Sequence, residues 1–351
     1  MSRNGGGELY LQSESEVETN IKQTDMRTGE YIVPEGTKEI GKYAFSSCSG
    51  MKRVVIPEGV EKIGEMAFYD CWDLESVEIP STVSEIDGSA FWYGPHSDVC
   101  EYWRKLKSIK VAEGNKVYDS REGCNAIIET ATGTLIVGCK TTVIPDGVKV
   151  IGERAFSSVD IRRVEIPDSV KMISSLAFTD CHRLKTIVIG AGVEKIGVGA
   201  FEGCDRGRIT VAKGNKVYDS REDCNGVIET ATGTMVLGSR NTVIPKGVKA
   251  IGDSVFMWNS PAEVVIPDGV EWIGGTAFAE GGLRKIVLPK SVKELGFWVF
   301  AGRDSLKEIW TDIENPTDSD FGQDRIRVMV PKGTVEKYRK AWGEENEYVE
   351  M

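Results

Sequence analysis

The chain has 351 residues and a formal net charge of −11. A chain this acidic, with no basic stripe, does not suit the phosphate backbone of nucleic acid, so we exclude that class of partner. The hydrophobic fraction of 40% and the charged fraction of 28% are ordinary for a folded protein. No run of about 18 apolar residues occurs, so we predict no membrane-spanning segment.

Residues 1–27 are polar and show no hydrophobic period, which predicts an irregular N-terminal tail or cap. The first seven residues lack the apolar segment of a secretory signal peptide. Two compartments stay open on this basis. The cytoplasm is the default, and an exported location applies if a leader was removed.

From residue 31 onward one short motif recurs, in which an apolar residue is followed by proline. Where no insertion intervenes, successive copies lie 22 or 23 residues apart. A fixed period of this size is typical of a solenoid, so residues 28–330 are predicted to form one repeat domain. The apolar residues of the motif are Val33, Ile56, Ile79, Ile144, Ile166, Ile266 and Leu288.

The repeat at residues 74–91 shows how one coil is built. Val77 and Ile79 alternate with polar residues, which is the pattern of a strand with one buried face. Pro80 cannot donate a backbone hydrogen bond and therefore ends the strand. The dipeptide Ala90-Phe91 is expected to point into the coil from the opposite side.

Stacking of such coils predicts two ladders of buried side chains. The first ladder comes from the strands: Val54, Val77, Ile109, Val164, Ile187, Ile209, Val264, Ile286 and Ile309. The second is aromatic: Phe45, Phe68, Phe91, Phe156, Phe178, Phe201, Phe256, Phe278 and Phe300.

A glycine stands three residues before the Ala-Phe dipeptide in most repeats, for example Gly64 and Gly197. Two explanations fit a recurring glycine: a positive backbone φ, or close approach of the neighbouring coil. Ser174 occupies this position in one repeat and favours close approach.

Residues 92–105 form an insertion rich in aromatic side chains. Clustered Trp and Tyr residues are typical of binding hot spots. The alternative is a short helix that packs back on the solenoid through Val99, Tyr102, Trp103 and Leu106. His96 and Cys100 give only two candidate metal ligands, too few to predict a site.

The segment 111–122 recurs at 211–222 with one change, and the match extends through residues 152 and 252. The offset is 100 residues throughout, so a block of several coils is duplicated. Each copy carries about ten extra residues, which are predicted to form a hairpin within 115–140 and within 215–240. Whether the turns at 119–125 and 219–225 bind an ion is open, because Asp and Asn in tight turns usually bond their own backbone.

Four of the eight cysteines fill one repeat position, three residues after the phenylalanine. Such a position is better explained by a small buried side chain than by a disulfide framework. We therefore expect reduced, structural cysteines. The four are Cys48, Cys71, Cys181 and Cys204.

Residues 331–351 are predicted to cap the solenoid. Thr334 is placed as the N-cap of a short helix. Val335, Tyr338 and Trp342 then share one helical face that covers the last coil.

The runs from Ile56-Pro57 to Ala67-Phe68, followed by Cys71 and Leu74, resemble the BspA-like, or Treponema pallidum-type, leucine-rich repeat family. The resemblance covers about residues 31–343. It implies an α/β repeat protein, a right-handed curved solenoid with a parallel sheet on its concave face. It also implies a bacterial surface or secreted protein that acts in adhesion and protein binding.

No catalytic constellation and no cofactor motif are recognisable, so we expect a non-enzymatic module, active as a monomer. A protein partner is the leading hypothesis, and a glycan is the alternative. The strand positions that face outward mix charged, hydroxyl and β-branched side chains, which suits protein more than sugar. The candidate partner-binding residues are Tyr69, Trp72, Trp92, Tyr93, Tyr102, Trp103, Arg163, Arg208 and Trp310.

Overall fold

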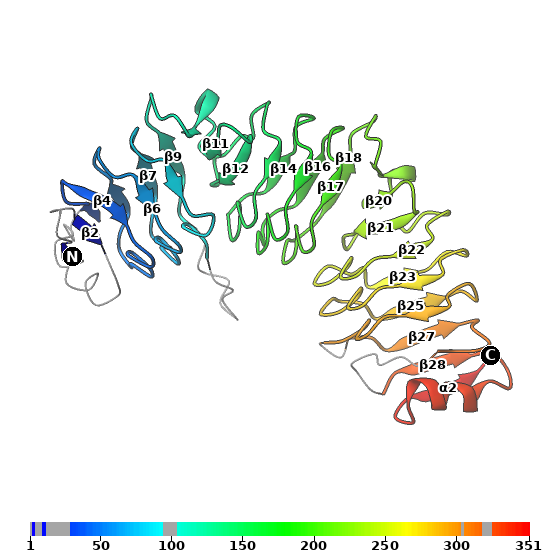
Figure 1. Ribbon diagram of the computed structural model, residues 1–351. Helices are drawn as coiled ribbons and strands as arrows, with labels where there is room; N and C mark the ends of the chain where they lie inside the picture. Colours follow the sequence, from blue (N-terminus) through cyan, green and yellow to red (C-terminus); the bar gives the residue numbers. More distant parts are fainter. Residues whose placement is uncertain (1, 4–8, 12–28, 94–103, 303–304, 318–324) are drawn as a thin grey trace. The chain divides into compact units, whose positions relative to one another are not determined.

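A computed structural model describes most of the chain (Figure 1). The described residues are 2–3, 9–11, 29–93, 104–302, 305–317 and 325–351. They belong to two compact units. Unit 1 comprises Met1–Ile161, Pro167–Arg183 and Lys195–Phe201, and unit 2 comprises Arg162–Ile166, Leu184–Glu194 and Glu202–Met351.

Unit 1 contains three sheets, in the orders β1-β2-β4-β6-β8, β3-β5-β7-β9 and β10-β11-β12-β13-β15-β17. Its strands are β1 (Ser2–Arg3), β2 (Leu9–Leu11), β3 (Glu30–Ile32), β4 (Thr37–Ile40), β5 (Arg53–Val55), β6 (Lys62–Ile63), β7 (Ser76–Ile79), β8 (Glu85–Ile86), β9 (Ser108–Val111), β10 (Tyr118–Asp119), β11 (Ile127–Glu129), β12 (Thr134–Val137), β13 (Val150–Ile151), β15 (Met172–Ile173) and β17 (Lys195–Ile196).

Unit 2 contains the sheets β14-β16-β18, β19-β20-β21-β22-β24-β26 and β23-β25-β27-β28-β29. Its strands are β14 (Arg163–Glu165), β16 (Thr186–Ile189), β18 (Arg208–Val211), β19 (Tyr218–Asp219), β20 (Val227–Glu229), β21 (Thr234–Leu237), β22 (Ala250–Ile251), β23 (Glu263–Val265), β24 (Trp272–Ile273), β25 (Lys285–Leu288), β26 (Glu294–Leu295), β27 (Glu308–Thr311), β28 (Arg327–Val330) and β29 (Glu347–Glu350).

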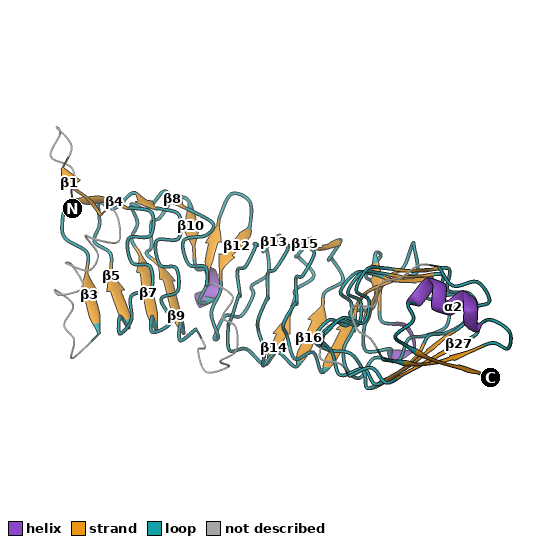
Figure 2. Cartoon of the chain, turned by 90° about the horizontal axis from the view of Figure 1, so that it is seen from below, coloured by secondary structure: helices purple, strands orange, loops and turns teal. Residues whose placement is uncertain are grey.

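Within each unit the coils stack as parallel strands, which confirms the predicted solenoid. Each regular coil gives one long strand to one sheet and a two-residue strand to another. In Figure 2 the long strands β3, β5, β7 and β9 lie along one side of unit 1, with β4 and β8 along the opposite side. The short strands were not predicted from the sequence.

The long strands form three separate sheets. We name them the N-terminal sheet (β3-β5-β7-β9), the middle sheet (β14-β16-β18) and the C-terminal sheet (β23-β25-β27-β28-β29). The predicted strand ladder is therefore divided. The division follows the duplicated blocks, because residues 138–143 and 238–243, where another long strand would start, are not strands.

The aromatic ladder is divided in the same way. Ring contacts join Phe45, Phe68 and Phe91 at centroid distances of 5.2 and 5.0 Å. They also join Phe156 to Phe178 and Phe201, and Phe256 to Phe278 and Phe300.

At the start of the second and third runs, the phenylalanine ring lies against a glycine. A Cβ built on Gly138 would lie 2.2 Å from Cε1 of Phe156. A Cβ on Gly238 would lie equally close, 2.2 Å, to Cε1 of Phe256. At this position the longer coils therefore contribute a glycine, which has no side chain, where a regular coil contributes a phenylalanine ring.

The repeat glycine is explained by close approach. Gly197 has no positive φ, but a Cβ there would lie 2.4 Å from the backbone nitrogen of Ser175. Left-handed backbone occurs two and six residues later, as at Met66 (φ 51°) and Asp70 (φ 56°) after Gly64. Two left-handed residues in each of these segments prevent an α-helix from forming there. The α component among the described residues is therefore small.

The described helices are α2 (Val335–Trp342) and two 3₁₀ turns, Arg121–Gly123 and Arg221–Asp223. Tyr338 and Trp342 of α2 are buried, as predicted. Thr334 stands at the N-cap, but its hydroxyl donates to the carbonyl of Pro331 at 2.6 Å and makes no cap to the helix. The predicted N-cap position is therefore confirmed, although the side-chain hydrogen bond of a cap is absent. No helix within the described part is long and apolar enough to cross a membrane.

Candidate interaction surfaces

The long strands expose every second side chain, as the alternation predicted. None of the outward side chains of these long strands is buried. The three sheets therefore present three surfaces that share a backbone arrangement but differ in their side chains. Their chemistry differs enough to distinguish them.

The C-terminal sheet carries an outward row of alternating charge. The strand register places the row in the order Glu263, Lys285, Glu308, Arg327 and Glu347. Lys285 Nζ lies 3.7 Å from Glu308, and Arg327 Nε lies 3.1 Å from Glu347. The hydrogen bond from Trp310 and these cations lower the pKa of Glu308. Opposite charges on neighbouring strands stabilise the register.

A second outward row, two residues further along each strand, is entirely apolar. It runs through Val265, Val287, Trp310, Met329 and Val349 in strand register. Val265 is 67% exposed, and the other four are half-buried. We call these five residues the apolar row. An unbroken apolar row on an outward sheet face marks a surface that favours contact with another molecule.

Trp310 is held in a fixed position within this row. Its Nε1 donates to Glu308 Oε2 at 3.0 Å, and Lys285 Nζ lies 4.4 Å from the centroid of its ring. The indole is thus anchored by the charged row. A preorganised Trp loses little side-chain entropy on binding, which is why such residues become hot spots.

The middle sheet is polar. Its two outward rows are Arg163, Thr186, Arg208 and Glu165, Val188, Thr210. Arg163 and Arg208 are exposed, and Arg163 forms an ion pair with Glu165 at 2.6 Å. These two candidate residues share one sheet, as their sequence positions predicted, but no apolar row accompanies them.

The N-terminal sheet is mixed. Its second row begins with Ile32, which is 64% exposed, and Val55. The row then turns charged at Glu78 and Lys110, which are paired at 3.3 Å. The apolar stretch is thus two residues long, against five in the C-terminal sheet.

The aromatic candidates at the end of the 70–93 region pack against one another. The rings of Trp72 and Tyr93 lie 4.6 Å apart. Tyr93 is 2% exposed, and its hydroxyl donates to the carbonyl of Cys71 at 3.1 Å. The guanidinium of Arg104 lies 4.9 Å from the Tyr93 ring, and burial raises the pKa of Tyr93. Tyr93 therefore supports the coil from within.

Trp92 and Tyr69 lie nearer the surface and are half-buried. The guanidinium of Arg154 lies 5.1 Å from the Trp92 ring. Burial raises the pKa of Tyr69. Tyr102 and Trp103, with His96 and Cys100, lie outside the described residues. Packing and binding by the rest of this insertion therefore stay open hypotheses.

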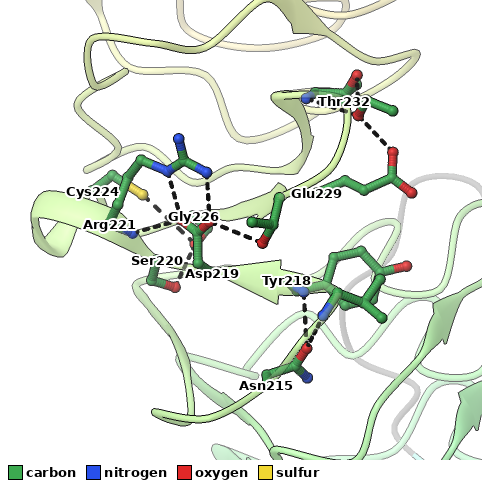
Figure 3. A network of polar contacts seen from close by, with 12 residues as sticks. Asn215, Tyr218, Asp219, Ser220, Arg221, Cys224, Gly226, Glu229 and Thr232 are labelled. Atoms are coloured by element: carbon green, nitrogen blue, oxygen red, sulfur yellow. Dashed lines mark hydrogen bonds and ion pairs between the residues drawn. The ribbon is translucent and has the colours of Figure 1, made fainter.

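The predicted hairpins are present in both copies of the duplicated block. In the second copy, β20 pairs antiparallel with β21, and β19 pairs with β20. Figure 3 shows the polar network that holds it. Asp219 accepts hydrogen bonds from the backbone and guanidinium of Arg221 and from Thr230. These bonds, above all the one from the Arg221 side chain, lower the pKa of Asp219.

Hydrogen bonds within the protein also engage the Asp and Asn of the 219–225 turn, for which ion binding was left open. Asp219 is fully engaged with Arg221 and Thr230, and Asn225 bonds the backbone of Ile209 and Gly207. Their spacing therefore serves the turn. No cluster of three potential metal-ligating side chains occurs among the described residues.

The repeat cysteines are structural within the described part of the chain. Seven cysteines there are buried and form no disulfide, and Cys100 lies outside it. Cys71 Sγ donates to the carbonyl of Phe45 at 2.9 Å, and Cys181 Sγ donates to that of Phe156 at 3.0 Å. Burial raises the pKa of Cys48 to about 12.

Two residues of the apolar row were missed in the sequence. Met329 lies in β28, within the predicted repeat domain, but its outward position was not predicted. Val349 lies in β29, which was not predicted at all. The alternation of Glu347, Tyr348 and Val349 was the available signal, but it covers only four residues.

Stacked parallel strands, Ala-Phe turns and outward sheet faces define a leucine-rich-repeat solenoid. The BspA type leucine rich repeat model matches residues 24–113, 136–221 and 238–327, and the chain belongs to this family. No curated protein matches the chain.

Three solved structures to which the chain is similar are bacterial proteins. A leucine-rich repeat protein from Eubacterium ventriosum is 18% identical, with a TM-score of 0.53, covering 92% of this chain and 81% of that one. A leucine rich cell surface protein from Faecalibacterium prausnitzii is 23% identical, with a TM-score of 0.46, covering 91% and 78%. The pneumococcal vaccine antigen PcpA is 14% identical, with a TM-score of 0.47, covering 92% and 89%. The similarity to the first of these supports the shared fold.

Proposed function

We propose that the chain is a non-catalytic protein-binding module that holds its partner on the outward face of the C-terminal sheet. The observation that carries this proposal is the apolar row, which crosses five adjacent strands without a polar interruption. Fully burying a side chain such as Val or Met contributes about 1.5–3 kcal/mol. The row therefore offers enough apolar surface for a specific contact.

The charged row beside it adds specificity. Its five alternating charges require a partner with a matching pattern, because a misplaced like charge is unfavourable. A glycan fits this face less well, because Lys285 already lies against the Trp310 ring on which a sugar would stack. The proposal does not extend to Tyr93, which is buried.

The test compares three full-length variants in the capture of proteins from cells that express the chain. Val287→Glu and Trp310→Glu place a charge in the apolar row. Val188→Glu makes the same change at the equivalent outward position of the middle sheet and serves as the matched control. Captured proteins are quantified by mass spectrometry after a photo-crosslinker at Val265 joins them to the chain.

We expect both apolar-row variants to reduce crosslinked partner by about tenfold or more, since a central hot spot contributes at least about 2 kcal/mol. The control variant should retain it. Equal capture by all three variants, with circular dichroism showing intact folds, would refute this location for binding.

A further inference from the structure

The last strand of the C-terminal sheet has one unpaired side. In the described residues, β29 pairs with β28 and with no other strand. The amides of Glu347 and Met351 donate to the carbonyls of Ile326 and Val330. Successive amides of a strand point to opposite sides, so the N–H groups of Tyr348 and Glu350 point away from β28. An open edge of this kind is a template for another strand.

The charged row is incomplete at this edge. Glu308, inside the row, has a cation on either side, Lys285 and Arg327. Glu347 has Arg327 on one side only, and its side chain is 61% exposed. A cation on a following strand would give Glu347 the surroundings that Glu308 already has.

The apolar row ends at the same edge, at Val349. A following strand in parallel register would place one side chain beside Glu347 and a second, two residues later, beside Val349. The row pattern requires Lys or Arg at the first position and an apolar residue at the second.

We propose that the edge of β29 binds an extended segment of the partner protein as an added parallel strand. This segment carries Lys or Arg beside Glu347 and an apolar, preferably β-branched, side chain beside Val349. The inference rests on the proposed function, because it gives the same partner a second contact at the end of the same sheet.

A second copy of this chain is a poor occupant of the edge. Its own first long strand, β3, carries Glu30 and Ile32 at the two outward positions. Stacking β3 on β29 in register places Glu30 beside Glu347. Two like charges on neighbouring strands destabilise the pairing, so the pattern selects against head-to-tail growth.

The chain itself supplies a matched pair of probes. A labelled peptide with the sequence of residues 283–290 places Lys285 and Val287 in the two required positions. A peptide with the sequence of residues 306–313 places Glu308 and Trp310 there instead. Both contain one strand of the same sheet. They differ in the sign of the charge that meets Glu347 and also in net charge, so the E347K variant, rather than their relative affinity alone, isolates the contact at Glu347.

Binding is measured by fluorescence anisotropy on the full chain. We expect the 283–290 peptide to bind more tightly than the 306–313 peptide. The E347K variant should weaken the first peptide by about fivefold to tenfold and strengthen the second, because each cross-strand charge pair changes sign. Glu336→Lys changes an 84% exposed acid on α2 and should alter neither affinity.

A third peptide, with the 283–290 sequence and methylated backbone nitrogens along the edge that meets β29, tests the added strand itself. Its binding should be lost. Equal affinity for all three peptides, or affinity for the first that E347K leaves unchanged, would overturn the proposal. Self-association of the chain that E347K abolishes would also overturn it, in favour of a second copy.

The two proposals fail separately. If capture of the natural partner depends on Trp310 but the peptides show no preference at Glu347, only the strand addition is wrong. If the peptides bind at the edge but Trp310→Glu leaves capture unchanged, only the face proposal is wrong.

Discussion

Single residues decide where coils touch and where a stack ends. Gly197 and Gly274 allow the neighbouring backbone to approach more closely than any Cβ permits. Gly138 and Gly238 play a different role, since each receives the ring of a phenylalanine from the following coil. These repeat glycines are therefore explained by their neighbours rather than by their own φ.

Gly238→Ala should destabilise unit 2 by about 1–3 kcal/mol, because the added methyl overpacks against Phe256. Gly282→Ala is the matched control in the same unit. Its Cβ meets nothing within 4 Å, so we expect a change within about 0.5 kcal/mol. Urea unfolding followed by tryptophan fluorescence measures both. Equal stability of the two variants would contradict the role assigned to Gly238.

For single residues, the sequence predicted which side chains are buried, but it did not predict which residues have a left-handed backbone. The buried Ala-Phe and strand residues could be predicted because their period is visible in the chain. The left-handed residues could not, because Met66 and Leu176 have no local preference for positive φ. Stacking of adjacent coils imposes that conformation, and stacking is not a local property.

Among the elements, the duplicated hairpins show how far a local network controls structure. In each copy an aspartate accepts hydrogen bonds from an arginine two residues later and from a threonine eleven residues later. The hairpin was predictable because its turn and its strands are adjacent in sequence. β29 was not, because pairing with β28 comes from outside its own four residues.

Asp219→Asn should weaken the second hairpin by about 1–2 kcal/mol, through loss of charge-assisted bonds to a partly exposed group. Hydrogen exchange in β20 and β21 should quicken. Asp119→Asn provides the internal control, since it should affect β11 and β12 instead. Faster exchange in both hairpins from either variant would contradict this independence.

The same variant has a defined pH dependence. The folded pKa of Asp219 is depressed, so its contribution is present above the unfolded value of about 3.9 and is lost as pH falls through the folded pKa. The stability difference between the wild type and Asp219→Asn should therefore shrink on acidification below about pH 4. A constant difference would show that the carboxylate charge is not responsible.

For the whole molecule, stability comes from contacts between neighbouring coils. Phe278 stacks between Phe256 and Phe300, at centroid distances of 4.9 and 6.1 Å. Each coil lacks a core of its own, so damage to one layer is felt by the layers beside it. Unit 1 and unit 2 each hold such stacks.

Phe278→Ala should cost about 3–5 kcal/mol in local stability. Hydrogen exchange should quicken in β22, β24 and β26, while β5 and β7 of unit 1 stay protected. Phe297→Ala removes an 82% exposed ring from the next coil and should change little. Uniform loss of protection over both units would show that the chain unfolds as one cooperative body.

The candidate surfaces were predicted less completely than the scaffold. The candidates Arg163, Arg208 and Trp310 do lie at outward strand positions, because alternation fixes which side chains leave the core. Which of them share a sheet depends on where the longer coils interrupt the strands. That interruption follows from glycines 138 and 238 and the segments after them, whose effect requires a neighbouring coil to be present.

In both copies the duplicated segment follows a long strand and precedes a regular coil. Both keep an internal bond from Ser120 or Ser220 and a bond from Asn115 or Asn215 to the preceding coil. One copy of such a block can therefore follow another, because the coils at its two ends already pack against the same kinds of neighbour. Copying it once more would lengthen the protein without demanding a junction that the chain has not already made. The number of outward sheet faces, and with it the length of the chain, can thus change by whole blocks while each coil keeps neighbours of the same kind.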